Sequence, residues 1–294
     1  MRFTGTGVAV ITPFTKGGEI DFSGIRSLVK HLNTGEIDYL VVLGSTGEAA
    51  TLNEKEKQQV LEAYFEANDG NLPIVVGAGG NDTREVCKQV AFWTKHYPAL
   101  SGILSVSPYY NKPSQEGIFR HYKAVSESTA LPVILYNVPG RTGSNMTPAT
   151  TIRLAEDCKN VVAMKEASGN LEQMMEIIRY APEGFQLISG DDALTLPIIA
   201  AGGKGVISVV AHAVPFSFSQ MVNHALNGEI DLAKAVHYLI WEWYSVAFAE
   251  GNPTSIKMIL ENLGVCERWV RSPLVEGSSH LEKMIQNLLL RQIL

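Results

Sequence analysis

Cysteine is scarce in this sequence, and no two histidines stand at metal-binding spacing. The three cysteines, Cys87, Cys158 and Cys266, are odd in number and far apart, which is typical of reduced cytosolic thiols. No cysteine has another cysteine or a histidine at the spacing of a metal site, and the seven histidines form no HxxxH pair. The sequence therefore predicts no structural metal.

An excess of positive charge is also lacking. The chain has 24 Lys and Arg against 30 Asp and Glu, a net charge of −6. Proteins that bind nucleic acid carry a basic surface, so this balance excludes nucleic acid as an expected partner. Low-complexity tracts are absent as well, and 46% of the residues are hydrophobic, so we expect a folded protein.

Long hydrophobic runs are missing. The run Val8–Ile11 near the start is too short for a signal peptide. The longest uncharged stretch, 205–228, contains Pro215 and two histidines, and it predicts a buried strand followed by a helix instead of a membrane span. We therefore expect a soluble, cytoplasmic protein.

Short apolar runs recur along the chain, for the most part at intervals of about 30 residues, the length of one βα unit. They are Val8–Ile11, Tyr39–Leu43, Ile74–Gly77, Ile103–Ser107, Val133–Tyr136, Val161–Lys165, Leu187–Ser189 and Val206–Val210. Each is apolar almost throughout, as in parallel strands that are covered on both faces. Eight such units predict a (β/α)₈ TIM barrel. An open doubly wound sheet would have fewer strands and usually a phosphate-binding fingerprint.

The alternation of strands and helices stops after Val210. Helices are predicted over Pro215–Leu226, Glu229–Ala249 and Thr254–Leu263, and a last helix is expected to begin at a capping box of Ser279 and Glu282. An earlier capping box, Asn53 with Glu56, predicts another helix start. We expect a catalytic barrel over residues 1–225 and a C-terminal helical extension over 226–294.

Lys165 ends the sixth predicted strand, directly after an apolar run. In such barrels the active site lies at the carboxyl ends of the strands, so its amine should project into the barrel mouth. An apolar wall lowers the pKa of an amine and makes it a nucleophile toward carbonyl groups. Position alone favours a lysine whose amine reaches out to water; the neighbouring strand ends favour the reactive lysine.

The neighbouring strand end carries Tyr136, and Arg141 follows five residues later. A buried tyrosine hydroxyl can shuttle protons, although a tyrosine of the hydrophobic core is an equally good reading of Tyr136 alone. Arg141 can bind a carboxylate through two parallel hydrogen bonds, although an arginine in a loop is more often solvated.

The second strand ends in the turn Gly44-Ser45-Thr46-Gly47. A turn of this kind can present backbone N–H groups and hydroxyls to a small anion. On its own the pattern is also that of an ordinary tight turn.

Together these strand ends resemble those of the dihydrodipicolinate synthase / N-acetylneuraminate lyase superfamily. The resemblance spans essentially the whole chain. It is carried by residues 7–14, 44–48, 108–113, 136–143, 165–170 and 190–192. It implies a pyruvate-dependent lyase on a TIM barrel that uses no metal or organic cofactor.

The resemblance also implies roles for individual residues. Pyruvate condenses with Lys165 as a Schiff base, and the Ser45–Thr46 turn holds its carboxylate. Tyr136, Thr46 and Tyr110 match a proton relay, in which Tyr110 reaches into the site of a neighbouring subunit. The chain is therefore expected to form a homo-oligomer, a tetramer of two tight dimers.

Further matches extend the pyruvate site. Two residues match positions that line it, Gly190 and Ile207. The family usually has two threonines where this chain has Ser45 and Thr46. Because serine keeps the hydroxyl, we expect only a modest kinetic effect.

Arg141 decides between branches of the superfamily. It matches the arginine that binds the carboxylate of L-aspartate 4-semialdehyde. The sialic acid lyases lack an arginine at this position. The resemblance thus implies condensation of pyruvate with this aldehyde to 4-hydroxy-tetrahydrodipicolinate, in the diaminopimelate and lysine pathway. Another pyruvate aldolase and a non-catalytic pyruvate-binding regulator remain as alternatives.

The resemblance finally locates an allosteric lysine pocket. Its candidate residues are Ala49, Ala50, Glu54, Lys57, Asn81, Glu85 and Tyr109. Lys57 would place an ammonium group close to the positive charges of bound lysine. We therefore predict that L-lysine inhibits weakly or not at all.

Overall fold

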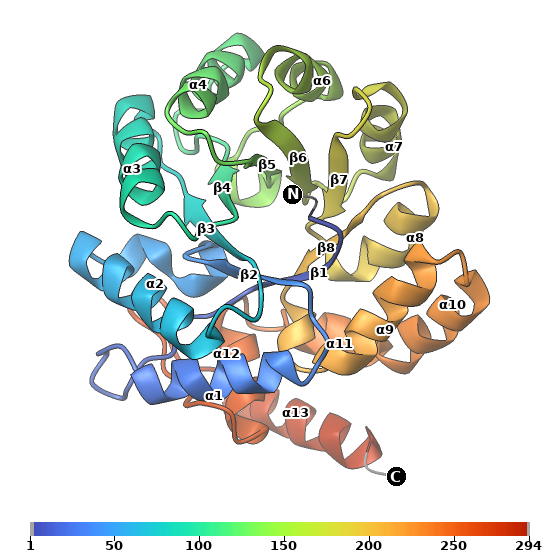
Figure 1. Ribbon diagram of the computed structural model, residues 1–294. Helices are drawn as coiled ribbons and strands as arrows, with labels where there is room; N and C mark the ends of the chain where they lie inside the picture. Colours follow the sequence, from blue (N-terminus) through green and yellow to red (C-terminus); the bar gives the residue numbers. More distant parts are fainter. Residues whose placement is uncertain (1–2, 293–294) are drawn as a thin grey trace.

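The computed structural model describes residues 3–292 and contains a closed barrel of eight parallel strands (Figure 1). The strands are β1 (Gly5–Ala9), β2 (Tyr39–Val42), β3 (Ile74–Ala78), β4 (Gly102–Val106), β5 (Val133–Asn137), β6 (Val161–Glu166), β7 (Gln186–Ser189) and β8 (Gly205–Ser208). Each strand pairs with the next along the chain, and β8 pairs with β1 to close the barrel. The predicted TIM barrel is confirmed.

Helices surround the barrel as an outer layer (Figure 1). They are α1 (Phe22–Asn33), α2 (Glu54–Asn68), α3 (Thr83–His96), α4 (Gln115–Glu127), α5 (Pro139–Thr142), α6 (Pro148–Asp157), α7 (Leu171–Tyr180), α8 (Thr195–Ala200), α9 (Pro215–Leu226), α10 (Ile230–Leu239), α11 (Trp241–Val246), α12 (Thr254–Asn262) and α13 (Ser279–Gln292). Short 3₁₀ turns complete the connections: η1 (Ser45–Gly47), η2 (Ala49–Thr51), η3 (Asp192–Leu194) and η4 (Val210–His212).

Two hydrophobic clusters form the core. One gathers the side chains that point into the barrel, among them Tyr39, Leu104 and Ile188. The other lies between the strands and the helices and includes Leu40, Ile103 and Leu187. Because both faces of the strands are covered, nearly every strand residue is buried, which explains why the strands are apolar almost throughout.

The first strand begins three residues and ends two residues earlier than predicted. The structure places β1 at Gly5–Ala9 instead of Val8–Ile11. Small residues are needed here because neighbouring groups approach closely. A Cβ atom on Gly7 would lie 2.3 Å from the ring of Tyr39. Packing inside the barrel therefore overrides the weak strand preference of glycine.

The two predicted capping boxes have different outcomes. At α2 both bonds are present: Glu56 N donates to Asn53 Oδ1 over 3.0 Å, and Asn53 N donates to Glu56 Oε2 over 2.8 Å. At α13 the box of Ser279 and Glu282 is wrong. Ser278 provides the acceptor there, at 3.3 Å from the N–H of Leu281. The Glu282 carboxylate binds Arg268 instead.

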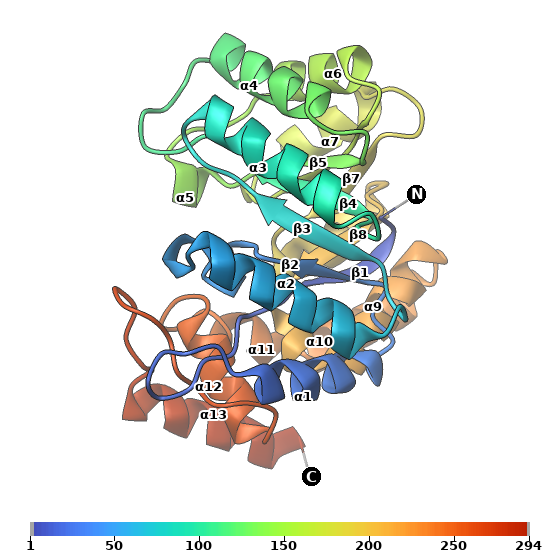
Figure 2. The same cartoon turned by 60° about the vertical axis from the view of Figure 1, so that its left-hand side comes forward.

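The C-terminal helices gather beside α1 in both ribbon views (Figures 1 and 2). The predicted helix Pro215–Leu226 is confirmed as α9. The predicted helix Glu229–Ala249 is instead two helices, α10 and α11, which are separated at Ile240. Ile240 is buried, and its non-helical backbone interrupts the predicted helix.

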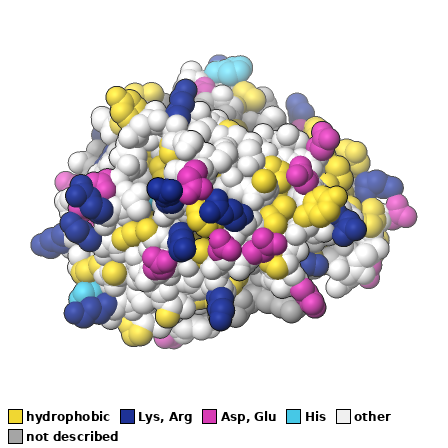
Figure 3. Space-filling view, turned by 90° about the horizontal axis from the view of Figure 1, so that it is seen from above, with side chains coloured by type: hydrophobic (Ala, Val, Ile, Leu, Met, Phe, Trp, Pro, Cys, Tyr) yellow, Lys and Arg dark blue, Asp and Glu magenta, His cyan; other side chains and the backbone are white. Residues whose placement is uncertain are grey.

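The surface carries charges of both signs. On the face shown in Figure 3, basic and acidic side chains are interspersed, without a broad region of one sign. This face gives no basic surface for a polyanion. Among residues 3–292, no helix combines the length and the apolar character that crossing a membrane requires.

Candidate active site

Tyr136 and Lys165 meet at the mouth of the barrel. They are register partners in β5 and β6, so both side chains point into the barrel from adjacent strands. They line a cavity of about 360 Å³. Its wall also includes Gly44, Ser45, Thr46, Val138, Arg141, Gly190, Asp191, Asp192, Val209, Tyr244, Phe248 and Asn252.

The amine of Lys165 lies near an aromatic ring and near charged side chains of both signs. Its side chain is buried, and Nζ lies 4.5 Å from the centre of the Tyr136 ring. Burial is the main cause that lowers the pKa of Lys165 to about 8; the negative charge of Asp192 opposes it, and the positive charge of Arg141 acts in the same direction as burial. A substantial neutral fraction near neutral pH makes this amine a nucleophile.

Tyr136 keeps its proton at neutral pH. Burial raises the pKa of its phenol to about 12, although the positive charge of Arg141 and a hydrogen bond with Ser45 act in the opposite direction. A protonated phenol beside an amine can donate a proton and take it back as charge develops.

The turn after β2 is held from two sides. Thr46 and Gly47 are buried in η1. The Thr12 hydroxyl donates to the Gly47 carbonyl over 2.7 Å, and the Asn252 amide donates to Thr46 Oγ1 over 2.9 Å. The turn thus presents hydroxyls of Ser45 and Thr46 at the cavity wall, close to the end of β6.

Arg141 lies on the short helix α5 instead of the loop that we expected. Pro139 begins this helix and Gly143 ends it in a left-handed conformation, with φ 74°. Arg141 lines the cavity, and its Nη2 donates to the carbonyl of Asn252 over 3.2 Å. It is therefore placed to meet a carboxylate at the cavity entrance.

Two aspartates after β7, Asp191 and Asp192, line the cavity, although no role was predicted for them. Asp192 is buried and accepts hydrogen bonds from the Ser208 hydroxyl and from Val209 N. Burial raises the pKa of Asp192 to about 6. Its carboxylate exerts the strongest charge effect on Lys165, so it belongs to the electrostatics of the site.

The sequence also missed Asn252, Tyr244 and Phe248. They come from the C-terminal extension, far along the chain from the strand ends. Asn252 contacts both Thr46 and Arg141. The Asn-Pro pair at 252–253 was the sequence signal available, since it marks a turn ahead of a helix.

Two residues predicted for the site, Ile207 and Tyr110, do not line this cavity. Ile207 is buried in β8 within the barrel core, and Val209 takes the corresponding place in the cavity wall. Tyr110 has 83% of its surface exposed and φ 75°, and it does not contribute to the described wall of the cavity. Gly190, by contrast, lines the cavity.

The predicted allosteric residues divide between two neighbouring cavities. A cavity of about 510 Å³ includes Ala49, Ala50, Lys57 and Tyr109, and one of about 630 Å³ includes Glu54, Lys57, Asn81 and Glu85. Lys57 belongs to both cavities and forms an ion pair with Glu54 at 2.7 Å.

Metal ligands do not gather in the described part of the chain. Within residues 3–292, no cluster of three or more His, Cys, Asp or Glu side chains could hold a metal ion.

Comparisons with known proteins place this geometry in one family. The model of the "Dihydrodipicolinate synthetase family" matches residues 2–292. A 4-hydroxy-tetrahydrodipicolinate synthase of Flavobacterium psychrophilum is 47% identical over 283 residues, 96% of each chain. The solved dihydrodipicolinate synthase of Thermotoga maritima has a TM-score of 0.96 at 38% identity, covering 99% of each chain. The chloride-inhibited enzyme of Acinetobacter baumannii, complexed with pyruvate, has a TM-score of 0.95 at 33% identity, again covering 99% of each chain. This chain belongs to the dihydrodipicolinate synthetase family.

Proposed function

We propose that this chain condenses pyruvate with L-aspartate 4-semialdehyde to give 4-hydroxy-tetrahydrodipicolinate, a step of diaminopimelate and lysine biosynthesis. The observation that carries the proposal is the buried Lys165 amine, with its pKa lowered to about 8, beside Tyr136 at the barrel mouth. The names of the relatives and the pyruvate complex of one of them support the same reaction.

The first half of the reaction takes place on Lys165. Its neutral amine attacks the carbonyl carbon of pyruvate, a C–N bond forms, and the carbonyl oxygen leaves as water. The cationic imine draws electrons from the methyl carbon, which loses a proton and becomes the nucleophilic carbon of an enamine. The imine is itself the electron sink, so the reaction requires no resident metal or organic cofactor.

The second half joins the two substrates. The enamine carbon attacks the aldehyde carbon, and the aldehyde oxygen becomes a hydroxyl after protonation. The substrate amine then attacks the imine carbon and loses a proton, while the C–N bond to Lys165 breaks. Ring closure thus returns Lys165 to its starting state.

The surrounding side chains transfer protons and bind the two substrates. The Tyr136 phenol and the Thr46 hydroxyl move protons to and from the reacting atoms. Ser45 and Thr46 hold the pyruvate carboxylate, next to Gly190. Arg141 binds the carboxylate of the aldehyde. The position of each of these side chains in the cavity wall supports these assignments.

Tyr110 is proposed to act across a subunit interface. Its side chain is exposed and lies outside the Lys165 cavity of its own chain, so a contribution to catalysis requires a second copy. We therefore include a homo-oligomer, a tetramer of two tight dimers, in the proposed function.

The test is to trap the imine. Borohydride added with pyruvate should inactivate the enzyme and attach a reduced pyruvyl group to the peptide that contains Lys165. Lys165→Met should remain unlabelled, while Lys159→Met, a change at an exposed lysine, should be labelled like the wild type. A label on another lysine would refute the mechanism.

A second assay separates the alternatives. The enzyme is offered pyruvate with L-aspartate 4-semialdehyde and, in parallel, N-acetylneuraminate alone. Product only from the first mixture supports the proposal. Cleavage of N-acetylneuraminate alone would favour another pyruvate aldolase, and imine trapping without turnover of either would favour a regulator.

A further inference from the structure

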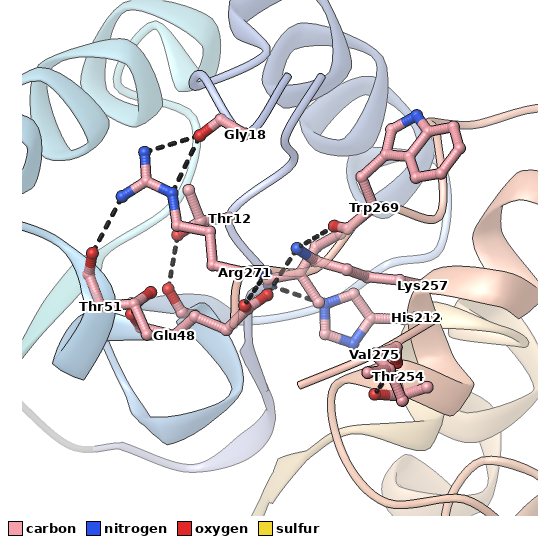
Figure 4. A network of polar contacts seen from close by, with 12 residues as sticks. Thr12, Gly18, Glu48, Thr51, His212, Thr254, Lys257, Trp269, Arg271 and Val275 are labelled. Atoms are coloured by element: carbon pink, nitrogen blue, oxygen red, sulfur yellow. Dashed lines mark hydrogen bonds and ion pairs between the residues drawn. The ribbon is translucent and has the colours of Figure 1, made fainter. Parts of the chain in front are cut away.

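Directly after the turn of Ser45 and Thr46, Glu48 is buried in an ion pair with Lys257 of α12 (Figure 4). Lys257 Nζ lies 2.6 Å from Glu48 Oε1, and the two side chains are 0% and 2% exposed. The other carboxylate oxygen of Glu48 accepts a hydrogen bond from the backbone N–H of Arg271 over 2.9 Å. Lys257 also donates to the carbonyl of Trp269 over 2.8 Å. The C-terminal extension therefore holds Glu48 by both carboxylate oxygens.

Arg271 and Phe14 extend this network to the N-terminal part of the chain. Lys257 Nζ lies 4.2 Å from the centre of the Phe14 ring, and the guanidinium carbon of Arg271 lies 4.5 Å from it. Arg271 also donates to the carbonyls of Gly18 and Thr51, over 2.7 and 2.9 Å (Figure 4). The segments before and after Glu48 are thus tied to the same C-terminal residues.

A second contact joins the same two segments inside the active site. Asn252, five residues before Lys257, donates from its side-chain amide to Thr46 Oγ1 and accepts from Arg141 through its carbonyl. Because α12 begins at Thr254, the helix links Asn252 to Lys257 with little freedom. A shift of Lys257 would therefore be passed on to Thr46 and Arg141.

The backbone at Glu48 depends on these contacts. Glu48 has φ 52° and ψ 33°, the left-handed conformation, between η1 and η2. Residues other than glycine rarely adopt this conformation, and it persists where the surroundings fix it. Glu48 Oε1 and Oε2 supply such fixation through Lys257 and Arg271.

We propose that Lys257 is a positioning residue for the reaction: its ion pair with Glu48 fixes the Ser45–Gly47 turn, and with it the hydroxyls that hold the pyruvate carboxylate. This inference rests on the proposed function, because it takes pyruvate as the ligand of the turn. Stability alone does not account for the pair, since uncharged residues often replace a buried ion pair without loss of stability. Accurate placement of the turn does account for it, because catalysis is sensitive to small displacements.

Three variants test the proposal. Lys257→Met removes the ammonium and leaves the Glu48 charge buried alone, which destabilises the fold. The double variant Glu48→Gln/Lys257→Met removes both charges and should restore the melting temperature toward that of the wild type. Arg268→Met is the matched control, because Arg268 pairs with Glu261 and Glu282 within the same extension, and none of the three lines the cavity.

The decisive measurement is the pyruvate concentration that gives half the maximal rate of borohydride inactivation, together with KM and kcat in the full assay. We expect both Lys257 variants to need about tenfold more pyruvate, the effect of a displaced turn. Arg268→Met should lower the melting temperature and leave the pyruvate requirement unchanged. A double variant with the wild-type pyruvate requirement would overturn the inference. A wild-type enzyme that is not labelled at all would instead overturn the proposed function, and this inference with it.

Discussion

Lys165 Nζ lies 4.5 Å from the centre of the Tyr136 ring, and the two residues are register partners of β6 and β5. The face of an aromatic ring attracts an ammonium ion, whereas burial disfavours it. The lowered pKa of Lys165, about 8, indicates that burial is the stronger influence. The pair therefore combines an amine that is partly neutral with a phenol that keeps its proton.

The rate of imine formation should depend on pH through Lys165. The neutral amine is the nucleophile, so the rate should rise as pH increases through its pKa of about 8. A group with this pKa is roughly tenfold more deprotonated at pH 9 than at pH 7, and the rate should follow. The measurement is borohydride inactivation at low pyruvate concentration across this pH range. A rise centred near pH 10.5 would show that the amine is not perturbed.

Asp192→Asn should shift that pH profile to lower pH. The Asp192 carboxylate raises the pKa of Lys165, and because its own pKa is about 6 it is ionised at neutral pH. Removing the charge should move the midpoint down by about half to one pH unit. Asparagine keeps an oxygen acceptor for Ser208. The control is Asp157→Asn at a half-exposed carboxylate near Arg153, which should leave the midpoint in place.

Arg141→Ala should affect the second substrate far more than the first. Losing a hydrogen bond to a charged group typically costs about 1.5–3 kcal/mol, which corresponds to at least roughly tenfold. We expect the KM for L-aspartate 4-semialdehyde to rise accordingly, while pyruvate trapping persists. Arg120→Ala, at an exposed ion pair with Glu116, is the control. Unchanged kinetics with the aldehyde would count against the assignment of Arg141.

Assembly should be required for full activity. Tyr110→Phe removes only a hydroxyl from an exposed side chain, so the melting temperature should stay the same. If the hydroxyl completes the relay of a neighbouring subunit, kcat should fall at least about tenfold, within the usual range for proton-transfer groups. Tyr180→Phe is a matched change at another exposed tyrosine. Sedimentation should show a tetramer, and a fully active monomer would contradict the prediction.

L-lysine should inhibit weakly. Lys57 lines both cavities that contain the candidate allosteric residues, and a bound lysine would bring a second ammonium close to it. Like charges ~4–6 Å apart cost on the order of 1 kcal/mol or more at an effective dielectric near 20. Glu54, paired with Lys57 at 2.7 Å, offsets part of this cost.

An L-lysine titration decides the matter. Half-inhibition should require more than about 1 mM, which corresponds to a weak binding free energy. Lys57→Gln should strengthen inhibition, whereas Lys55→Gln, at an exposed lysine of the same helix, should not. Half-inhibition of the wild type well below this concentration would refute the electrostatic argument.

The barrel could be predicted from sequence because its strands are buried on both faces and therefore apolar almost throughout. The prediction of the first strand failed because close packing there requires glycine, which is not typical of strands. Gly5 and Gly7 belong to β1 although glycine is a poor strand former. The helix cap at Ser278 was missed because the S-x-x-E pattern belongs to Ser279, whereas Ser278 stands three residues before Leu281. The division into units at residue 225 stays a prediction.

The site was predictable as far as it lies at strand ends. Lys165, Tyr136 and the turn of Ser45 and Thr46 meet in one cavity, as their strand positions predicted. Asn252 could not be found in this way, because it contacts Thr46 from 206 residues further along the chain. Its contribution depends on how the C-terminal helices pack, which no local pattern encodes.

The closure of the barrel has a consequence for its synthesis. One edge of β1 pairs with β8, where Gly5 is the partner of Gly205. On a growing chain this edge remains unpaired until those later residues exist, and an open strand edge is a template for aggregation. A first strand that begins with Gly5-Thr6-Gly7 has little tendency to pair with strands of other chains before β8 is made. The glycines of β1 that leave room for Asp38 and Tyr39 in the finished barrel thus also protect the unfinished one.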